Sequence, residues 1–334
     1  MKPIPRVVEK GKRLRAPRGQ RGDASQPAAD LAPLPLADLR ESVLHGEAEA
    51  VLQRFPAGAI DCTVTSPPYY RQRDYSDKKQ LGQEDSPQAY IDRLTAIFAQ
   101  VRRATSPAGS LWLNLGDKYE EGRLLGLPWR VALALAEEGW ILRSDCIWQK
   151  PNAMPSPVAN RPTTDHEYLF FFVKSQEYFY DADAIREPHV TFSEKSKMKG
   201  GRKHFGVAGG TPEQGKNAGA SNLHRGRWDQ AFHPLGRNKR TVWSIPLSKF
   251  RDAHFAVFPE SLVETCVRAS CPPGGLVLDP FCGSGTTLLV AKRLGRNYCG
   301  IDCAKKYVAM SRKRLADAGS TPQAPHDGEV SRPR

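Results

Sequence analysis

The chain has 334 residues, 40% of them apolar, which suits one large α/β domain with an insertion or two small domains. Its net charge is +13 at pH 7, and the excess is local, with a net +7 in residues 1–21 and a net +9 in residues 195–240. Two basic segments on a nearly neutral remainder indicate a nucleic-acid partner rather than general solubility. Residues 1–21 fit a solvated tail equally well.

Hydropathy and cysteine usage exclude several classes of protein. No apolar run approaches the length of a membrane-spanning helix, and the basic start lacks the apolar stretch of a signal peptide. The seven cysteines form no Cys-x-x-Cys pair, and most have apolar neighbours. This pattern predicts reduced, buried thiols in a cytoplasmic protein, with no metal site and no membrane partner.

The first half of the chain alternates predicted strands with helices. Residues 1–38 are rich in Pro, Ala, Gly and charge, which is typical of a disordered basic tail. Apolar spacing predicts helices over residues 39–52, 87–101 and 128–138. Strands are predicted over residues 60–65, 110–115, 140–148 and 167–173. Residues 39–189 therefore form one half of an α/β domain.

Residues 190–240 interrupt this alternation, because they are rich in Gly, Lys and Arg and show almost no aliphatic periodicity. They are predicted to be an insertion. Strands follow at residues 241–245, 276–278 and 298–301, and helices at residues 259–267, 286–294 and 305–315. Residues 318–334 have the composition of a disordered tail, so residues 241–317 form the second half of a doubly wound, mostly parallel sheet.

A glycine loop follows the strand at residues 276–278. Pro280 ends this strand, the glycines permit a tight turn, and Thr286 opens a helix, so backbone N–H groups point outward as in nucleotide-binding loops. No Lys follows the glycines, which excludes a P-loop, and the three-glycine dinucleotide fingerprint is missing. Asp302 lies about 20 residues later, where Rossmann-like sheets place a ribose-binding acid. An ordinary βαβ turn remains the alternative for the loop taken alone.

A second polar segment, Ser66-Pro67-Pro68-Tyr69, follows the strand at residues 60–65. Ligand sites of open α/β sheets lie at this edge. The two prolines fix the directions of the carbonyl groups, Ser66 offers a hydroxyl acceptor, and Tyr69 offers a flat face with a polar tip. A planar heterocycle with an exocyclic amine would fit there. A surface linker is the alternative, which the position after a buried strand disfavours.

Together, TSPPYY and LDPFCGSGTT resemble the amino-group DNA methyltransferases that use S-adenosylmethionine. Their order along the chain resembles the β permutation of that family. Further similar stretches are SLWLNLGDKY, IWQKPNAMPSPVANRPTTDHEYLFFFVKS, GRNKRTVWSIP, HFAVFPESLV and GIDCAKKYVAMSRKRL, so that the resemblance covers most of residues 42–315. It implies a Rossmann-like methyltransferase sheet whose catalytic half is residues 39–189 and whose cofactor-binding half is residues 241–317. Residues 190–240 would be the target-recognition region between them.

The resemblance also implies roles for individual residues. The catalytic residues would be Ser66, Pro67, Pro68 and Tyr69. The residues that bind S-adenosyl-L-methionine would be Asp279, Pro280, Phe281, Cys282, Gly283, Ser284, Gly285, Thr286, Asp302, Phe258 and Pro259. One departure is Gly46-Glu47, where relatives usually have Gly-Asp, and no role is assigned to it.

The first residue of the tetrapeptide bears on the target base. Ser66 resembles the enzymes that methylate cytosine at N4, whereas Asp is typical of adenine-N6 enzymes, so adenine remains the alternative. The sequence lacks the Pro-Cys dipeptide that both cytosine carbon-5 methylation and zinc-dependent deamination need. The resemblance therefore implies methyl transfer to the N4 amine of a flipped-out cytosine in double-stranded DNA, in a restriction–modification system.

The basic insertion is predicted to contact DNA. Phosphate contacts are assigned to Lys195, Lys197 and Lys199, and base reading is assigned to Arg225, Arg227 and Arg237. A second copy of the chain and a cognate restriction endonuclease are further partners to test. Two alternative functions stay open at this point: a DNA-binding module with a vestigial nucleotide fold, and a methyltransferase acting on RNA or protein.

Overall fold

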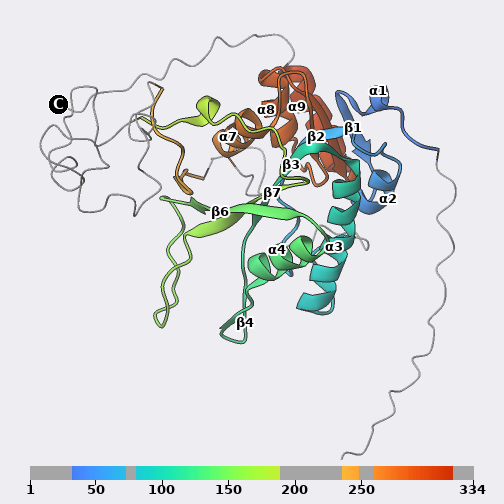
Figure 1. Cartoon of the computed structure of the whole chain (residues 1–334). Coiled ribbons are helices and arrows are strands. Elements are labelled where there is room, and N and C mark those ends of the chain that lie inside the picture. Colours follow the sequence, from blue (N-terminus) through green and yellow to red (C-terminus); the bar gives the residue numbers. More distant parts are fainter. Residues whose placement is uncertain (1–31, 73–79, 189–234, 248–258, 319–334) are drawn as a thin grey trace, which may run out of the picture. The chain divides into compact units, whose positions relative to one another are not determined.

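The computed structural model describes residues 32–72, 80–188, 235–247 and 259–318, and from Pro33 onward they belong to one compact unit (Figure 1). The helices are α1 (Leu36–Leu39), α2 (Ala48–Gln53), α3 (Pro87–Ala104), α4 (Leu127–Glu137), α7 (Glu260–Ser270), α8 (Thr286–Arg293) and α9 (Lys305–Asp317), with a 3₁₀ turn η1 (Asp183–Ile185). The strands are β1 (Ser42–His45), β2 (Ile60–Thr65), β3 (Thr105–Leu115), β4 (Tyr119–Glu120), β5 (Arg123–Leu124), β6 (Ile141–Gln149), β7 (His166–Val173), β8 (Val242–Ser244), β9 (Leu276–Asp279) and β10 (Asn297–Asp302).

Eight of these strands form one sheet in the order β1-β10-β9-β2-β3-β7-β6-β8. Only β7 runs antiparallel to its neighbours, β3 and β6, and the other pairings in this sheet are parallel. The separate hairpin β4-β5 follows β3. The predicted mostly parallel, Rossmann-like sheet is therefore confirmed.

The strand order reverses between β2 and β9, which are paired in parallel through Cys62–Val277 and Thr63–Leu278. From β2 the chain continues through α3 to β3 on one side, whereas from β9 it continues through α8 to β10 on the other. Open α/β sheets bind their ligands at such a switch point, outside the carboxyl ends of the strands. The residues that follow β2 and β9 are therefore the first place to look for a site.

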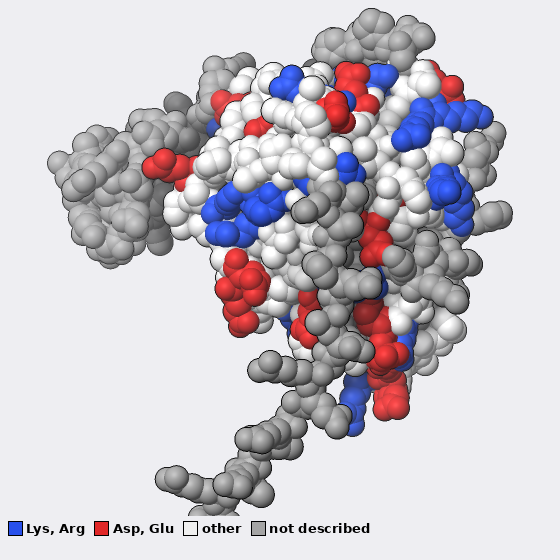
Figure 2. Space-filling view, turned by 90° about the vertical axis from the view of Figure 1, so that its right-hand side faces the viewer, with Lys and Arg blue, Asp and Glu red and all other residues white. Residues whose placement is uncertain are grey.

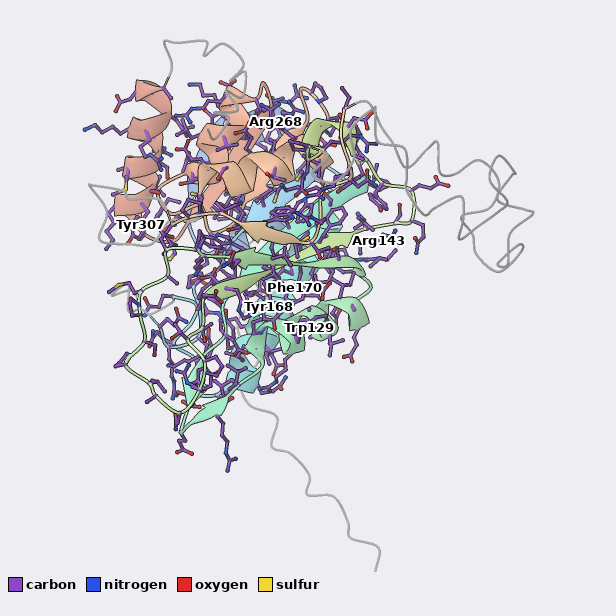
Figure 3. The ribbon with its side chains drawn as sticks, turned by 90° about the vertical axis from the view of Figure 1, so that its left-hand side faces the viewer. Trp129, Arg143, Tyr168, Phe170, Arg268 and Tyr307 are labelled. Carbon is purple, nitrogen blue, oxygen red and sulfur yellow. The ribbon has the colours of Figure 1, made fainter. Side chains whose placement is uncertain are left out.

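Two apolar clusters lie on opposite faces of the sheet, because successive side chains of a strand point to opposite sides. Leu111 and Leu113 of β3 belong to the cluster covered by α2, α3 and α4, whereas Trp112 belongs to the cluster covered by α7, α8 and α9. On the face covered by α4, Trp129 lies against Phe170 of β7 with ring centroids 5.2 Å apart (Figure 3). The cysteines support the predicted thiol state: six are buried, Cys303 is partly exposed, and none of the seven forms a disulfide.

The helix predicted over residues 39–52 is wrong. The structure replaces it with α1, the edge strand β1 and α2. Glu41 and Gly46 have φ values of 53° and 151°, which a continuous helix does not allow. Val43 is buried while β1 pairs with β10, so sheet pairing outweighs the local helical spacing. In addition, α1 takes in Leu36–Leu39, the last residues of the segment predicted as a tail.

The base of the predicted insertion is fixed by Glu187, just before it, and by residues near its end. Glu187 and Arg237 form an antiparallel bridge with backbone hydrogen bonds of 2.9 and 2.8 Å. The Glu187 carboxylate also lies within 4 Å of cationic groups of Arg237, Lys239 and Arg240.

On the face in Figure 2, the Lys and Arg side chains form separate patches with Asp and Glu between them. None of the described helices is long and apolar enough to cross a membrane.

Candidate active site

Two loops meet beyond the carboxyl ends of β2 and β9. Ser66 follows β2, and Pro280 follows β9. Asp279, the last residue of β9, is 1% exposed and accepts hydrogen bonds from Thr65 and Thr287 at 2.7 and 2.8 Å. Burial raises the pKa of this carboxyl from 3.8 to about 6, although the two hydroxyl donors oppose that shift. The buried Asp279 therefore ties the two loops together.

The glycine loop turns in front of α8 and is braced by α9. Gly283 and Gly285 have φ values of 51° and 80°, in the left-handed region that favours glycine. A side chain at Gly285 would also collide with Ser311, whose Oγ lies 2.9 Å from the position of a Cβ. Ser311 in turn donates to the Gly283 carbonyl at 2.6 Å, and Arg314 donates to the Ser284 carbonyl at 2.7 Å. The loop is thus held from behind, with its other face left for a ligand.

Asp302 lies at the end of β10, opposite this loop. Its carboxylate accepts from the backbone N–H groups of Gly283 and Ala304 at 3.0 and 2.8 Å. Burial raises the pKa of the Asp302 carboxyl above its usual range, and these two N–H donors oppose the shift. A carboxylate has about four acceptor positions, so two remain for ligand hydroxyl groups.

The tetrapeptide after β2 belongs to a hydrogen-bonded network that the sequence did not predict. Ser66 Oγ donates to Tyr69 Oη at 3.1 Å, and Tyr69 Oη donates to Glu167 Oε2 at 2.7 Å. Asn114 Nδ2 lies 3.3, 2.8 and 2.7 Å from Ser66 Oγ, Tyr69 Oη and Glu167 Oε2. Lys150 forms an ion pair with Glu167 Oε1. Because a carboxylate can only accept, the amide nitrogen of Asn114 must face Glu167.

Tyr69 is fixed by packing as well as by these bonds. The Tyr69 ring lies against Gly116, where a Cβ would come within 2.8 Å of Tyr69 Cε2. Tyr90 Oη donates to the Pro68 carbonyl at 2.9 Å and holds the second proline of the motif. Burial, followed by the nearby Glu167 carboxylate, raises the pKa of the Tyr69 phenol well above its usual value. Tyr69 is therefore a neutral hydrogen-bond donor at neutral pH.

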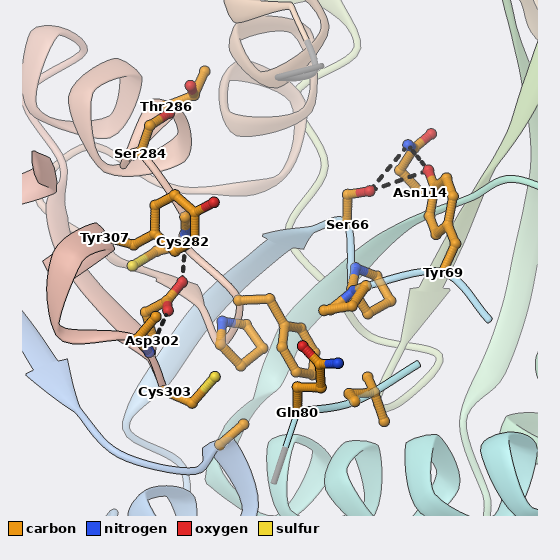
Figure 4. A pocket seen from close by; sticks show the side chains of 18 of the residues that line it. Ser66, Tyr69, Gln80, Asn114, Cys282, Ser284, Thr286, Asp302, Cys303 and Tyr307 are labelled. Carbon is orange, nitrogen blue, oxygen red and sulfur yellow. Dashed lines mark hydrogen bonds between the residues drawn. The ribbon is translucent and has the colours of Figure 1, made fainter. Parts of the chain in front are cut away.

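The network and the glycine loop line one cavity of about 280 Å³ (Figure 4). One end is lined by Ser66, Pro67, Pro68, Tyr69, Asn114, Trp148, Lys150 and Glu167. The other end is lined by Pro280, Phe281, Cys282, Gly283, Ser284, Thr286, Asp302, Cys303, Tyr307 and Met310, with Glu47 and Glu49 from the β1–α2 segment. Two ligands placed at the two ends would therefore meet without crossing solvent.

The cofactor end suits a nucleoside with a positively charged, partly apolar group. It combines the open face of the glycine loop and the free acceptor positions of Asp302 with apolar walls from Phe281 and Met310. Arg93 of α3 also lines the cavity, but its guanidinium is paired with the Glu84 carboxylate at 3.0 Å, whereas a phosphate-bearing nucleotide would need donors directed at the phosphates. These residues fit an adenosyl sulfonium compound better than a dinucleotide.

Not all of the predicted site residues line the cavity. Asp279, Gly285 and Pro259 are not among its lining residues: Asp279 ends β9, Gly285 precedes α8 and Pro259 precedes α7. Phe258, Lys195, Lys197, Lys199, Arg225 and Arg227 lie outside the described residues. Arg237 is described, and its guanidinium is paired with Glu187 at 3.3 Å rather than extended into solvent.

The sequence missed Asn114, Lys150 and Glu167. Asn114 is a polar residue in an otherwise apolar strand, and Glu167 precedes the apolar run of β7. Both patterns are signals of a polar group at a strand end. Glu167 could be placed in the site only with the direction of β7, which the residue pattern does not give.

The cavity lies at the switch point of the sheet, with a glycine loop and an acid at one end and the Ser-Pro-Pro-Tyr segment at the other. This arrangement is typical of group-transfer enzymes that use a nucleotide cofactor. Within that class the chain belongs to the N6/N4 DNA methylase family, whose model, described as "DNA methylase", matches residues 60–313. The predicted membership of the chain in this family is thereby confirmed.

Named relatives support this assignment. The chain is 37% identical to the type II methyltransferase M.XycI of Xanthomonas campestris pv. cyanopsidis, over 87% of this chain and 92% of that one. It is 35% identical to the type II methyltransferase M.SmaI of Serratia marcescens, over 82% and 90%. The chain is thus a type II DNA methyltransferase of this family.

Solved structures with the same fold include a putative DNA modification methylase from Thermus thermophilus in complex with S-adenosyl-L-methionine. It has 25% identity and a TM-score of 0.52, with 83% of this chain and 95% of that chain covered. Another is the PvuII DNA methyltransferase, described as cytosine-N4-specific, with 22% identity, a TM-score of 0.60 and coverage of 84% and 92%. The latter likeness shows the fold.

Proposed function

We propose that this protein transfers a methyl group from S-adenosyl-L-methionine to the N4 amine of a flipped-out cytosine in double-stranded DNA. The observation that carries the proposal is the single cavity shared by the glycine loop and the tetrapeptide. One end suits an adenosyl sulfonium compound, and the other presents fixed acceptors beside a tyrosine ring. A methyl donor and a planar amine would meet between them.

Two acceptors at the tetrapeptide can orient the target amine. Ser66 Oγ accepts from Asn114 and donates to Tyr69, so it keeps one lone pair for an amine N–H. The Pro67 carbonyl is the second acceptor, since the Pro68 carbonyl already accepts from Tyr90. Hydrogen bonds from both amine hydrogens to fixed oxygens favour a pyramidal nitrogen whose lone pair is localised. The bound cofactor supplies an electrophilic methyl group on a sulfonium.

Positioning carries most of the rate enhancement in this scheme. The prolines fix the backbone, and Tyr69 is locked between Gly116 and the Glu167 carboxylate. A reacting pair held at near-attack distance gains effective concentration without any covalent intermediate. The base must leave the duplex to reach the end of the sheet, and the Tyr69 ring offers stacking that offsets the unstacking cost.

Cytosine N4 is proposed over adenine N6 because Ser66 is neutral. With Ser as the first residue of the tetrapeptide, the acceptor for the amine carries no charge of its own, and Ser66 is connected to the Glu167 carboxylate through Tyr69. This arrangement matches the motif of the N4 enzymes, as the sequence indicates.

DNA recognition is proposed for the basic segment of residues 190–240. Lys195, Lys197 and Lys199 would contact phosphates, and Arg225 and Arg227 would read guanine edges. Arg237 is better suited to bracing the base of this segment, because it pairs with Glu187. We further propose that the protein acts in the cytoplasm, in a restriction–modification system with a cognate endonuclease. A homodimer is the oligomeric state to test alongside.

Nucleoside mass spectrometry of DNA methylated by the purified protein tests the target. Duplex DNA is incubated with S-adenosyl-L-methionine, digested and compared with DNA incubated without enzyme. N4-methylcytosine is expected. N6-methyladenine without methylated cytosine would replace cytosine by adenine as the target, and methylation of RNA alone would reject DNA as the substrate.

A further inference from the structure

The cavity contains a path for a proton that the tetrapeptide alone does not provide. Methylation of an amine leaves the nitrogen positively charged until it loses a hydrogen. Ser66 is a neutral hydroxyl and cannot keep that proton, so a stronger base must receive it. Among the described residues at the tetrapeptide end of the cavity, the one carboxylate is that of Glu167. The other lining carboxylates, Glu47, Glu49 and Asp302, belong to the cofactor end.

Ser66, Tyr69 and Glu167 are linked by hydrogen bonds that all run in one direction. The Ser66 hydroxyl donates to Tyr69 Oη at 3.1 Å, and the Tyr69 hydroxyl donates to Glu167 Oε2 at 2.7 Å. Each oxygen therefore already points its hydrogen toward the carboxylate. Groups within hydrogen-bond reach of one another can pass a proton along such a chain by successive short transfers.

The Glu167 carboxylate is held by one cationic group and one amide donor. Lys150 forms an ion pair with Oε1, and Asn114 Nδ2 donates to Oε2 at 2.7 Å. The titratable groups that face Glu167 are Lys150 from the end of β6 and Tyr69 from the loop after β2. Its neighbour His166 is directed to Asp165, at 3.6 Å. The Glu167 side chain is 14% exposed, so a proton received there can leave to solvent.

We propose that Glu167 is the terminal proton acceptor of the methyl transfer, acting through Tyr69 and Ser66. The inference rests on the proposed function. The N–CH₃ bond forms as the S–CH₃ bond breaks, and the amine then gives one proton to Ser66 Oγ. Ser66 passes its own proton to Tyr69, and Tyr69 passes its own to Glu167. The products are a neutral methylated amine, a neutral thioether and a protonated Glu167. Since Glu167 does not touch the base, it is a positioning residue that also receives the proton.

Glu167→Gln in the full-length protein tests the proposal. Glutamine keeps the shape of the side chain but cannot accept a proton at neutral pH. We expect the single-turnover methylation rate at saturating DNA and cofactor to fall by about 100-fold. The KM for DNA and the calorimetric Kd for S-adenosyl-L-methionine should change by less than about two-fold, because Glu167 does not touch the base and lies at the opposite end of the cavity from the cofactor.

The pH–rate profile separates proton acceptance from a structural role. In the wild-type protein the single-turnover rate should fall at acidic pH, where the carboxylate is protonated, and this acidic limb should be missing in Glu167→Gln. Tyr69→Phe should lose the same limb, because it cuts the path while keeping the ring. Tyr90→Phe is the matched control. It removes another tyrosine hydroxyl bonded to the tetrapeptide, at 2.9 Å from the Pro68 carbonyl, and should keep the limb.

An unchanged rate in Glu167→Gln, or an acidic limb that persists in both Glu167→Gln and Tyr69→Phe, would overturn the proposal. If Glu167→Gln does not fold, judged by thermal melting, Tyr69→Phe decides alone. Failure of the proposed function has a different outcome, because the wild-type protein would then leave no methylated amine in DNA at any pH.

Discussion

Thr65 and Asp279 are 214 residues apart in the chain, yet the Thr65 hydroxyl donates to the Asp279 carboxylate at 2.7 Å. Thr65 is the last residue of β2 and immediately precedes the tetrapeptide, while Asp279 is the last residue of β9 and immediately precedes the glycine loop. Both side chains are at most 1% exposed. This buried hydrogen bond therefore adds a side-chain link between the two halves of the cavity to the pairing of β2 with β9.

Replacement of Thr65 by valine should destabilise the protein. Valine has nearly the same shape but no hydroxyl, so Asp279 Oδ1 keeps only the Phe281 N–H at 3.1 Å. An incompletely paired buried carboxylate costs about 1–3 kcal/mol. Chemical denaturation measures this loss. The control is Thr63→Val on the same strand, because Thr63 Oγ1 is buried and has no hydrogen-bond partner among the described residues. Equal losses in both variants would contradict the coupling.

Asp279→Asn should change how stability depends on pH. The folded pKa of Asp279 is raised from 3.8 to about 6, so its contribution to stability is full below pH 4 and is lost as the pH rises to about 6. Two pKa units correspond to about 3 kcal/mol. Asparagine cannot ionise, so the stability of the wild type relative to this variant should fall between pH 4 and 6 and stay level above. Parallel pH curves from denaturation experiments would refute this.

Gly116→Ala should reduce catalysis without affecting the cofactor. The new Cβ would lie 2.8 Å from Tyr69 Cε2, so the Tyr69 ring must move. A displacement of this size at a positioning residue can cost up to about 100-fold in rate. We expect kcat/KM for DNA to fall at least about ten-fold in steady-state assays. Calorimetry should give a wild-type Kd for S-adenosyl-L-methionine, and a weakened Kd would mean that Gly116 acts on the other end of the cavity.

Ser66→Ala and Asp302→Ala should affect opposite ends of the cavity. Ser66→Ala removes an acceptor for the amine, so turnover should fall by about 100-fold or more while cofactor affinity stays nearly intact. Asp302→Ala removes the carboxylate opposite the glycine loop, so cofactor affinity should weaken first. Binding calorimetry and single-turnover rates on both variants check this. Loss of cofactor binding in Ser66→Ala would reject the assignment of the two ends.

Replacement of residues 195–233 by a short glycine–serine linker should abolish site-specific methylation while the protein still folds and binds S-adenosyl-L-methionine. The linker can be short because Glu187 and Arg237 are paired through both backbone hydrogen bonds. Nucleoside mass spectrometry and calorimetry measure the two properties. Unchanged methylation would move recognition to another segment, such as the residues after Tyr70 in the same cavity wall.

The positions of the tetrapeptide and the glycine loop could be predicted, because each follows a buried parallel strand and such strands end at the same edge of a sheet. The network around Glu167 could not. It depends on β7 running antiparallel, which brings the first residues of that strand to the edge where its neighbours end. Strand direction is set by tertiary packing and leaves no trace in the apolar pattern.

The edge strand β1 was missed for a related reason. Four residues are too few for a strand pattern, and helical spacing on both sides of Ser42–His45 masks them. Their strand conformation comes from pairing with β10, which lies more than 250 residues later in the chain. A local sequence window contains no information on such a partner.

The pairing of β1 with β10 also bears on the order in which a gene can encode the two halves of this domain. The first and last strands of the described chain are neighbours, so the two ends of the folded unit emerge at the same side of the sheet. The chain could be opened between Glu187 and Arg237 and joined through its present ends, and every strand would keep its neighbours. Such a protein would begin with the cofactor half and end with the catalytic half. The fold therefore places little constraint on which half is synthesised first, and rearranged genes could encode the same enzyme.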